Sequence, residues 1–235
     1  MEIDNFDVFE KHLTFTDKTD RYIVHILRRP KDCKQISSTW GSNECQRLLR
    51  TYYIDSIEYF NRKRDAIKEL CTTNRARAYI LPQVRNNYEC LLNLGEKVLE
   101  TIRLGNFSAK PEHLLRSAYC EYHKSRSKKW IIDLDSSEMY GWTVDDVLEL
   151  VRSQLRKIEK SDDEAYLIQT KSGHHIVTTP FNLMEGYEKC PMLYEGEKTF
   201  IEKKPCGPGE YEDIRHKRVG WLHKDGMSLL YLNMD

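Results

Sequence analysis

The six residues Trp130-Ile131-Ile132-Asp133-Leu134-Asp135 combine a short run of large apolar side chains with two aspartates. A brief apolar run of this kind predicts a buried β-strand. Because successive side chains of a strand point to opposite faces, Asp133 and Asp135 share one face at the strand's C-terminal end. The segment therefore predicts a strand that delivers two carboxylates to one side of a sheet.

The residues that follow predict a helix and then two paired strands. Thr143 stands before the acidic residues Asp145 and Asp146, which suits a capped first turn, and apolar residues at helical spacing extend this helix to about residue 160. Residues 165–170 and 174–179 predict strands on either side of the turn Lys171-Ser172-Gly173. The expected order is therefore strand, helix and hairpin.

The rest of the chain predicts further strands and helices. Strands are expected over 21–29 up to Pro30, over 48–60 with a helix as the alternative, and over 76–81 up to Pro82. Helices are expected over 61–70 and over 88–104, where apolar residues recur at helical spacing before Gly105; residues 106–129 form a basic connector. Asp225-Gly226 lies between two apolar runs and predicts a hairpin near the C-terminus.

These elements predict an α+β protein, with helices packed on one side of a mainly antiparallel sheet. Residues 1–129 are expected to form the N-terminal α/β portion of the same domain, which could bind template or nucleotide. Residues 130–235 are expected to form its catalytic half. A chain of 235 residues suits one large domain or two small ones.

Composition excludes some classes of protein. Hydrophobic residues make up 40% of the chain, so global disorder is not expected, and 37 basic residues balance 37 acidic ones, which weighs against a general DNA-coating protein. The longest apolar runs fall far short of the roughly 20 residues that cross a bilayer, so no membrane insertion is expected. Seven cysteines without a Cys-x-x-Cys pair indicate a reducing, cytoplasmic location.

Two carboxylates held close together favour a divalent cation. Their mutual repulsion is relieved by protonation or by a metal ion, and Mg²⁺ or Mn²⁺ fits oxygen ligands and leaves positions for the phosphates of a nucleoside triphosphate. The simpler interpretation is that Asp133 and Asp135 only begin a turn after a buried strand.

The segment from Thr170 to His175 has the composition of a phosphate-binding turn. Lys171 supplies a cation, Ser172 a hydroxyl and Gly173 a backbone that an anion can approach, while His174 and His175 can donate hydrogen bonds. The alternative is an ordinary polar hairpin. Because strand faces alternate, only one of the two histidines can point into a site unless the strand twists or bulges.

Together, the hydrophobic-Asp-x-Asp strand, the helix and the Ser/Gly turn that ends in histidine resemble the archaeo-eukaryotic primase and primase-polymerase superfamily. The resemblance covers roughly residues 130–181. It implies a metal-dependent nucleotidyltransferase with Asp133 and Asp135 as metal ligands, and Ser172 with His175, or His174, on the nucleotide's phosphates. A third carboxylate is expected at Asp225, with Asp235 as the alternative.

The resemblance implies that a 3′ hydroxyl attacks the α-phosphate of a nucleoside triphosphate on single-stranded or primed nucleic acid. Basic and aromatic residues of the N-terminal half are candidates for contacts with triphosphate or template, although solvated surface charge and core packing explain each of them more simply. These candidates are Arg75, Arg77, Arg85, the basic run 124–129, Tyr52, Tyr53 and Tyr79.

Two other functions remain open at this stage. Haloacid-dehalogenase-like phosphatases also have an apolar strand that ends in Asp-x-Asp and a later threonine or serine after a strand, a place that Thr170 would fill. The tail of this chain, however, offers no convincing version of their later acidic motif. A non-catalytic nucleotide- or protein-binding module with the same fold is the other alternative. Cys120 and His123, with Cys190, Cys206 or His216, form a faint candidate zinc set, and ordinary buried cysteines are favoured.

Overall fold

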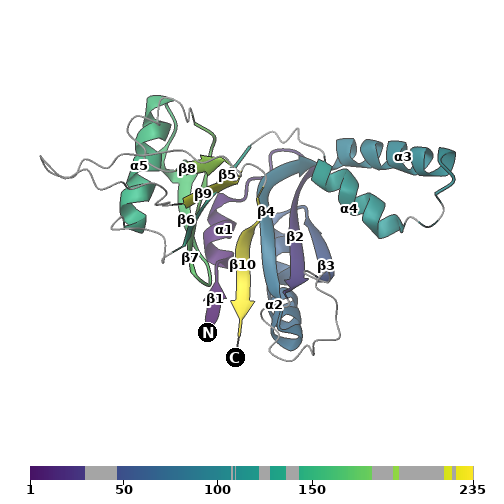
Figure 1. The fold of residues 1–235 in the computed structure, drawn as a ribbon, viewed down its shortest axis with the longest axis horizontal. Helices are drawn as coiled ribbons and strands as arrows, with labels where there is room; N and C mark the ends of the chain where they lie inside the picture. Colours follow the sequence, from purple (N-terminus) through teal and green to yellow (C-terminus); the bar gives the residue numbers. More distant parts are fainter. Residues whose placement is uncertain are drawn as a thin grey trace, which may run out of the picture.

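The computed structural model contains two five-stranded sheets (Figure 1). It describes residues 1–29, 47–106, 108, 110–121, 128–135, 143–181, 193–195, 220–223 and 226–234. The first sheet has the order β1 (Glu2–Asp4), β10 (Ser228–Asn233), β4 (Arg77–Asn86), β2 (Asp20–Arg28) and β3 (Arg47–Ile54). The second has the order β6 (Ala165–Gln169), β7 (Gly173–Thr178), β5 (Trp130–Asp135), β9 (Gly220–His223) and β8 (Leu193–Glu195).

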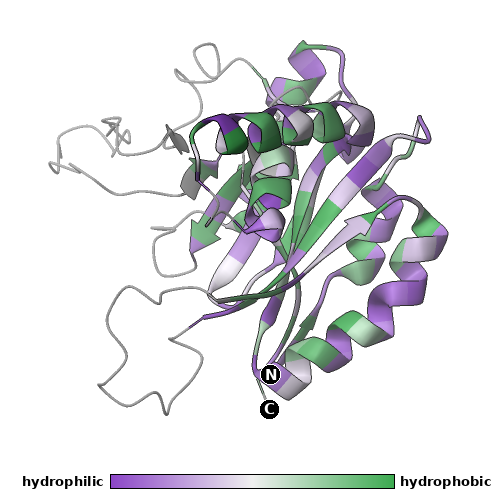
Figure 2. Cartoon of the chain, turned by 90° about the vertical axis from the view of Figure 1, so that its right-hand side faces the viewer, coloured by the Kyte–Doolittle hydropathy of each residue, from purple (hydrophilic) through white to green (hydrophobic). Residues whose placement is uncertain are grey.

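Two helices cover one face of the first sheet. Helix α1 (Phe6–His12) and helix α2 (Ile57–Asn74) bury Phe6, Phe9 and Phe60 against strand residues such as Ile80. The same apolar cluster continues into Tyr166 of the second sheet, so one core joins the two sheets. Figure 2 shows hydrophobic residues running along the central strands and mixed polar and apolar residues on the surrounding helices.

Helices α3 (Asn87–Arg103) and α4 (Pro111–Glu121) pack against each other and lie at the opposite end of the molecule from α5 (Figure 1). Cys90 of α3 and Tyr119 of α4 are buried against Ile23 and Leu81, which attaches the helix pair to the first sheet. Gly105, with a φ of 63°, ends α3 in the left-handed conformation that glycine adopts most readily.

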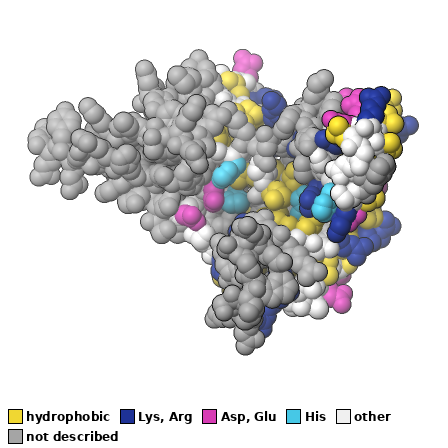
Figure 3. All heavy atoms as spheres, turned by 45° about the vertical axis from the view of Figure 1, so that its right-hand side comes forward, with side chains coloured by type: hydrophobic (Ala, Val, Ile, Leu, Met, Phe, Trp, Pro, Cys, Tyr) yellow, Lys and Arg dark blue, Asp and Glu magenta, His cyan; other side chains and the backbone are white. Residues whose placement is uncertain are grey.

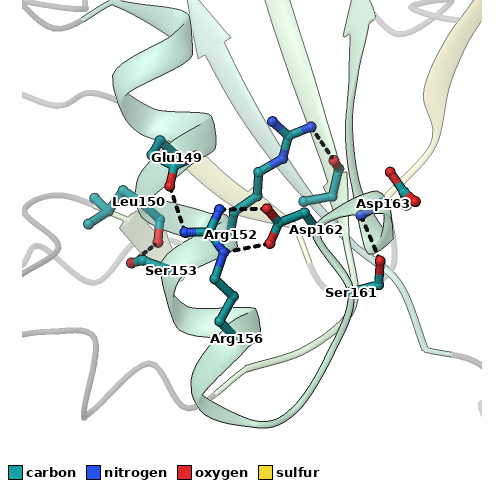
Figure 4. A network of polar contacts seen from close by, with 9 residues as sticks. Glu149, Leu150, Arg152, Ser153, Arg156, Ser161, Asp162 and Asp163 are labelled. Carbon is teal, nitrogen blue, oxygen red and sulfur yellow. Dashed lines mark hydrogen bonds and ion pairs between the residues drawn. The ribbon is translucent and has the colours of Figure 1, made fainter.

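Helix α5 (Val144–Lys157) covers one face of the second sheet. It begins with a capping box, in which the Thr143 hydroxyl accepts from the Asp146 amide and the Asp146 carboxylate accepts from the Thr143 amide. In its last turn, Arg156 reaches the carboxylates of Glu149 and Asp162, which ties the helix to the 3₁₀ turn η2 (Asp162–Glu164) (Figure 4).

The two faces of β5 have different environments. Ile132 and Leu134 pack against α5 with Val151 and Leu155, whereas Ile131 lies in the core that the two sheets share. Asp133 and Asp135 are on the Ile131 face, away from α5. The predicted shared face of the two aspartates is therefore confirmed, and it is turned toward the first sheet.

The α+β class with mainly antiparallel pairing is confirmed, but the strands form two sheets instead of one, and each sheet has its own helices. Residues 130–135, 144–157, 165–169 and 173–178 form the predicted strand, helix and hairpin. The chain then returns to the first sheet, because β10 pairs with β1 and β4. Residues 130–235 therefore contribute strands to both sheets.

Several local predictions are wrong. Residues 48–60 contain nearly all of β3 and then the start of α2, and residues 106–129 contain α4. Strand β4 continues through Pro82. Pairing of β4 with β10 ends at Ile80, and its pairing with β2 is irregular between Arg21 and Ile23. The missing amide proton of the proline therefore breaks no regular ladder.

The hairpin predicted around Asp225-Gly226 is also wrong. Strand β9 pairs with β5 and β8 of the second sheet, whereas β10 belongs to the first sheet. Gly226 follows β9 closely, and a Cβ atom at this position would lie 2.9 Å from the Cβ of His223 and 3.2 Å from the Cδ1 of Ile131. A glycine is required there by close packing at the crossing between the sheets.

Candidate functional site

A cavity of about 650 Å³ lies between the two sheets and is lined by both. The second sheet contributes β5, the end of β9, and β7 with the turn before it, and the first sheet contributes β2, β4 and β10. Its lining includes Asp133, Asp135, Lys171, Ser172 and His175, all expected from the sequence. On the face drawn in Figure 3, histidine and acidic side chains lie together beside hydrophobic ones, with Lys and Arg side chains farther along.

Asp133 and His175 are neighbours across the β5 and β7 ladder. The Nε2 atom of His175 lies 3.3 Å from the Oδ1 atom of Asp133, and its Nδ1 atom lies 3.0 Å from the hydroxyl of Ser228. A carboxylate only accepts hydrogen bonds, so Nε2 carries the proton in this contact, and Nδ1 of a neutral ring accepts from Ser228. Ser228 belongs to the first sheet, so His175 contacts both sheets.

The carboxyl of Asp133 is held in its ionised form. Burial by itself raises the pKa of this group, but the hydrogen bond and charge of His175, with the charges of His223 and Arg29, outweigh burial and bring the pKa below its ordinary value. Asp133 is therefore an anion near neutral pH, although it is only partly exposed.

Asp135 is bound to the turn that joins β6 and β7. The hydroxyl of Ser172 donates to the Oδ1 atom of Asp135 at 2.7 Å, and both side chains line the cavity. The turn is closed by two further bonds, from the Thr170 amide to the Gly173 carbonyl and from the Gly173 amide to the Thr170 hydroxyl. The Gly173 amide therefore points to Thr170 within the turn.

The first sheet brings two arginines and an aromatic ring to the opposite wall. Arg77 of β4 is buried, and its Nη1 atom lies 3.5 Å from the hydroxyl of Tyr79. The Arg29 guanidinium lies over the Tyr79 ring, 5.3 Å from its centre, and its buried Nε atom has no hydrogen-bond partner among the described residues. The cavity therefore has an acidic wall and a basic wall.

The remaining predicted site residues are not part of this cavity lining. His174 pairs in register with Leu134, and Leu134 faces α5, so His174 lies on the face of β7 opposite His175. Gly173 is buried and does not line the cavity. Asp225 and Asp235 lie outside the described residues.

Of the three arginines proposed for the triphosphate or template, only Arg77 lines the cavity. Arg75 occupies the left-handed C-cap of α2, and Arg85 is buried in β4. Tyr79 lines the cavity, whereas Tyr52 is a buried core residue and Tyr53 packs on Tyr119.

The basic run and the zinc set are placed only in part. Lys129 donates to the Thr179 hydroxyl at 2.9 Å and lies 3.8 Å from Glu164, while residues 124–127 lie outside the described part of the chain. The same holds for His123 and for the side chain of Cys120. Cys71 and Cys90 are buried, as expected for ordinary cysteines.

Sequence reasoning did not identify Arg29, His223 or Ser228 as site residues. Each lies at or just beyond the end of a strand. Arg29 and His223 line the cavity, while buried Ser228 bonds to His175, and only the crossing of the chain between the sheets brings the three together. The sequence did contain a signal for Arg29. It is the last residue of the alternating stretch 21–29 and shares a face with Leu27.

Comparison with protein-family models, with curated proteins and with solved structures finds no match for this chain. Within the described ranges, no group of three or more His, Cys, Asp or Glu side chains is arranged to hold a metal ion. No helix among these residues has both the length and the apolar character needed to cross a membrane.

Proposed function

We propose that the chain is a metal-dependent nucleotidyltransferase of the primase-polymerase type, acting in the cytoplasm on nucleoside triphosphates and a single-stranded or primed nucleic acid. The observation that carries this proposal is the cavity itself. Asp133 and Asp135 share one wall with His175, 3.3 Å from Asp133, and the opposite wall presents Arg29 and Arg77.

The two carboxylates suit Mg²⁺ or Mn²⁺. Mg²⁺ in proteins is commonly held by one or two carboxylates together with substrate phosphates, so a third protein ligand is not required. Asp133 and Asp135 would hold the ion from the same face of β5, and Asp225 is the proposed third carboxylate. A bound divalent ion polarises a phosphoryl oxygen and lowers the pKa of an attacking hydroxyl.

The chain's own residues position the substrate. Lys171 and Ser172, in the turn beside Asp135, are placed to contact phosphate oxygens, and Arg29 and Arg77 neutralise negative charge from the other side. His175 is oriented by Ser228 and Asp133, so its ring is fixed before a nucleotide enters. A phosphate that displaces Asp133 from Nε2 would accept the same proton.

A nucleotide fits the cavity in size and in chemistry. A volume of about 650 Å³ falls within the roughly 300–1,000 Å³ of small-molecule sites. Leu27, Tyr79, Met227 and Leu229 supply apolar surface on the first-sheet side, where a base or sugar could lie, while the charged groups face the phosphates.

The test is strand extension by the purified full chain. Wild type is incubated with a labelled primer on a template, and separately with an unprimed template, in the presence of Mn²⁺ or Mg²⁺ and nucleotides. We expect Asp133→Asn to lower the rate by about 10³-fold, because a bound metal contributes several kcal/mol to transition-state stabilisation. Circular dichroism checks that the variant remains folded.

Asp163→Asn is the matched control. Asp163 is an exposed aspartate in the 3₁₀ turn η2, just before β6 of the second sheet, and it does not line the cavity (Figure 4). The activity of this variant should therefore equal that of wild type. A folded wild type that binds nucleotide but extends no strand would support the non-catalytic binding module instead. Release of phosphate from an aryl phosphate with Mg²⁺, without strand extension, would support the phosphatase.

A further inference from the structure

Helix α3 carries a hydrophobic face that no other described residue covers. Seven residues of α3 and the turn after it are large apolar side chains with exposed fractions from 37% for Val98 to 75% for Leu104. The only other large hydrophobics exposed to this degree among the described residues are Met1 and Ile158. The seven are Tyr88, Leu91, Leu92, Val98, Leu99, Ile102 and Leu104.

The six that lie within the helix form a single stripe, which we call the α3 stripe. Tyr88, Leu91, Leu92, Val98, Leu99 and Ile102 recur at intervals of three and four residues around Gly95, so they share one face over about 21 Å of helix. The opposite face holds Cys90, which is buried, and Asn93, which donates to the Ala118 carbonyl of α4. The apolar side chains of α3 are therefore mostly on the outer face, and the inner face is largely polar.

We propose that the α3 stripe is the contact surface of a symmetric homodimer, in which α3 packs antiparallel against α3 of a second copy around a two-fold axis at Gly95. Exposed apolar stripes of this extent mark interaction sites in soluble proteins. A two-fold axis requires a self-complementary surface. The α3 stripe meets this requirement because its apolar residues are arranged almost symmetrically about Gly95.

The stripe is close to a palindrome about Gly95. Antiparallel pairing centred there places Leu92 beside Val98 of the second copy, Leu91 beside Leu99 and Tyr88 beside Ile102. Each apolar residue therefore meets another apolar residue. A partner of unrelated sequence would not require this symmetry.

Gly95 itself favours a close helix contact. Glycine in an exposed helix interior costs about 1 kcal/mol relative to alanine. A Cβ atom built on Gly95 would have no atom of the described residues within 4 Å, so packing against that part of the chain does not explain the glycine. A second backbone approaching at the axis does explain it, since the absent side chain lets the helices come closer.

The charges at the two ends of α3 suit antiparallel pairing, and the charges of the whole helix bear on the kind of partner. Glu89 and Arg103 lie on the same flank of the stripe at opposite ends of α3, so antiparallel pairing places each Glu89 beside Arg103 of the second copy. The helix has Glu89, Glu96 and Glu100 against Lys97 and Arg103, which does not suit a nucleic acid or an anionic lipid surface.

The dimer is tested by the molar mass of the full chain in solution, measured by light scattering or sedimentation from about 1 to about 100 μM, a range that brackets a micromolar dissociation constant. Wild type should approach the mass of two chains. Leu99→Glu should raise the dissociation constant at least tenfold, since it buries a charge at the contact. Ile158→Glu is the matched control, because Ile158 is 39% exposed but lies at the end of α5, and its mass should equal wild type.

Gly95→Leu separates the contact from folding. The open space around Gly95 accepts the new side chain in one copy, so the thermal midpoint should not fall, while the added bulk at the axis should raise the dissociation constant at least tenfold. A wild type that is monomeric at about 100 μM would overturn the proposal. A dimer that survives both Leu99→Glu and Gly95→Leu would also overturn it, because the contact would then lie elsewhere.

Gly95→Cys tests the two-fold axis directly. A residue on the axis meets its own copy, so mild oxidation should give a disulfide-linked dimer in a yield above that of wild type, which has seven cysteines of its own. Ile158→Cys should show only the wild-type background. A yield from Gly95→Cys equal to that background would contradict the position of the axis.

Discussion

The two walls of the cavity differ in charge and in how the chain builds them. The second sheet supplies Asp133 and Asp135 from one strand, two positions apart, and the first sheet supplies Arg29 and Arg77 from neighbouring strands β2 and β4. A carboxylate wall repels a triphosphate unless a cation lies between them, whereas a guanidinium wall binds it directly. The walls therefore have opposite effects on an anion when no metal is present.

The first prediction concerns binding of a nucleoside triphosphate in the presence of a chelator. Arg29→Ala should weaken binding by about 10- to 100-fold, because hydrogen bonds to charged groups contribute about 1.5–3 kcal/mol. Asp133→Asn should strengthen it, since one repelling charge is lost. Isothermal titration measures both.

Arg62→Ala is the control, because Arg62 is an exposed residue of α2 outside the cavity. If Arg29→Ala and Asp133→Asn changed metal-free affinity in the same direction, the assignment of opposite roles to the two walls would be wrong.

The second prediction concerns what keeps the walls facing each other. The Asn5 side chain donates to the carbonyls of Gln169 and Leu229, at 2.9 and 3.0 Å, and so bridges the second sheet and the first. Asn5→Ala leaves both carbonyls without this donor and should lower the free energy of unfolding by about 2 kcal/mol, measured by urea denaturation.

Asn61→Ala serves as its control, since Asn61 is exposed and its side chain donates to the Glu10 side chain. A loss for Asn5→Ala no greater than that of Asn61→Ala would show that the bridge is not what joins the sheets.

The third prediction concerns pH and the first sheet. Burial, reinforced by the charge of Arg116, lowers the pKa of His25 from 6.5 to about 4. The unfolded chain then takes up a proton at a higher pH than the folded chain, so this contribution to stability is complete above pH 6.5 and is lost as the pH falls toward about 4.

At pH 5 the loss should be about 1–2 kcal/mol. His25→Gln should flatten the dependence of unfolding free energy on pH over this window, measured by denaturation at pH 7, 6 and 5. An unchanged slope would show that His25 does not titrate differently in the folded protein.

The smallest expected effect concerns the cap of α5, the helix that covers the second sheet on the face away from the cavity. Thr143→Ala removes the hydroxyl of the capping box of α5 and should cost about 1 kcal/mol of stability, while Thr143→Ser retains the bond and should cost less. Thermal unfolding of the two variants makes the comparison. Equal losses would assign the effect to the lost methyl group.

Local pattern predicted the second sheet more successfully than the first. The strand at 130–135, the capped helix α5 and the β6–β7 hairpin follow each other closely in sequence, so short-range rules were sufficient to predict them. In the first sheet, β1 and β10 come from opposite ends of the chain. Pairing over that separation leaves no local signal, and the Asp-Gly dipeptide between apolar runs predicts a hairpin, although the strands on its two sides belong to different sheets.

Helix α3 shows a different limit of sequence reasoning. Its apolar spacing correctly predicted a helix over 88–104, but the spacing alone did not reveal that Leu91 and Leu99 are exposed while Cys90 is buried. An amphipathic pattern identifies which residues share a face. It does not identify whether that face meets the same chain, a second copy or solvent.

The amino-acid order alone determined that Asp133 and Asp135 lie on one side of a strand and that His174 and His175 lie on opposite sides of another, because alternation along a strand is a property of its backbone. Only the tertiary structure decided that His175 faces Asp133, that Ser228 orients its ring, and that Arg29 and Arg77 stand across the cavity. These contacts join strands from two sheets, and the crossing of β10 into the first sheet is set by packing of the whole chain, which no short segment encodes.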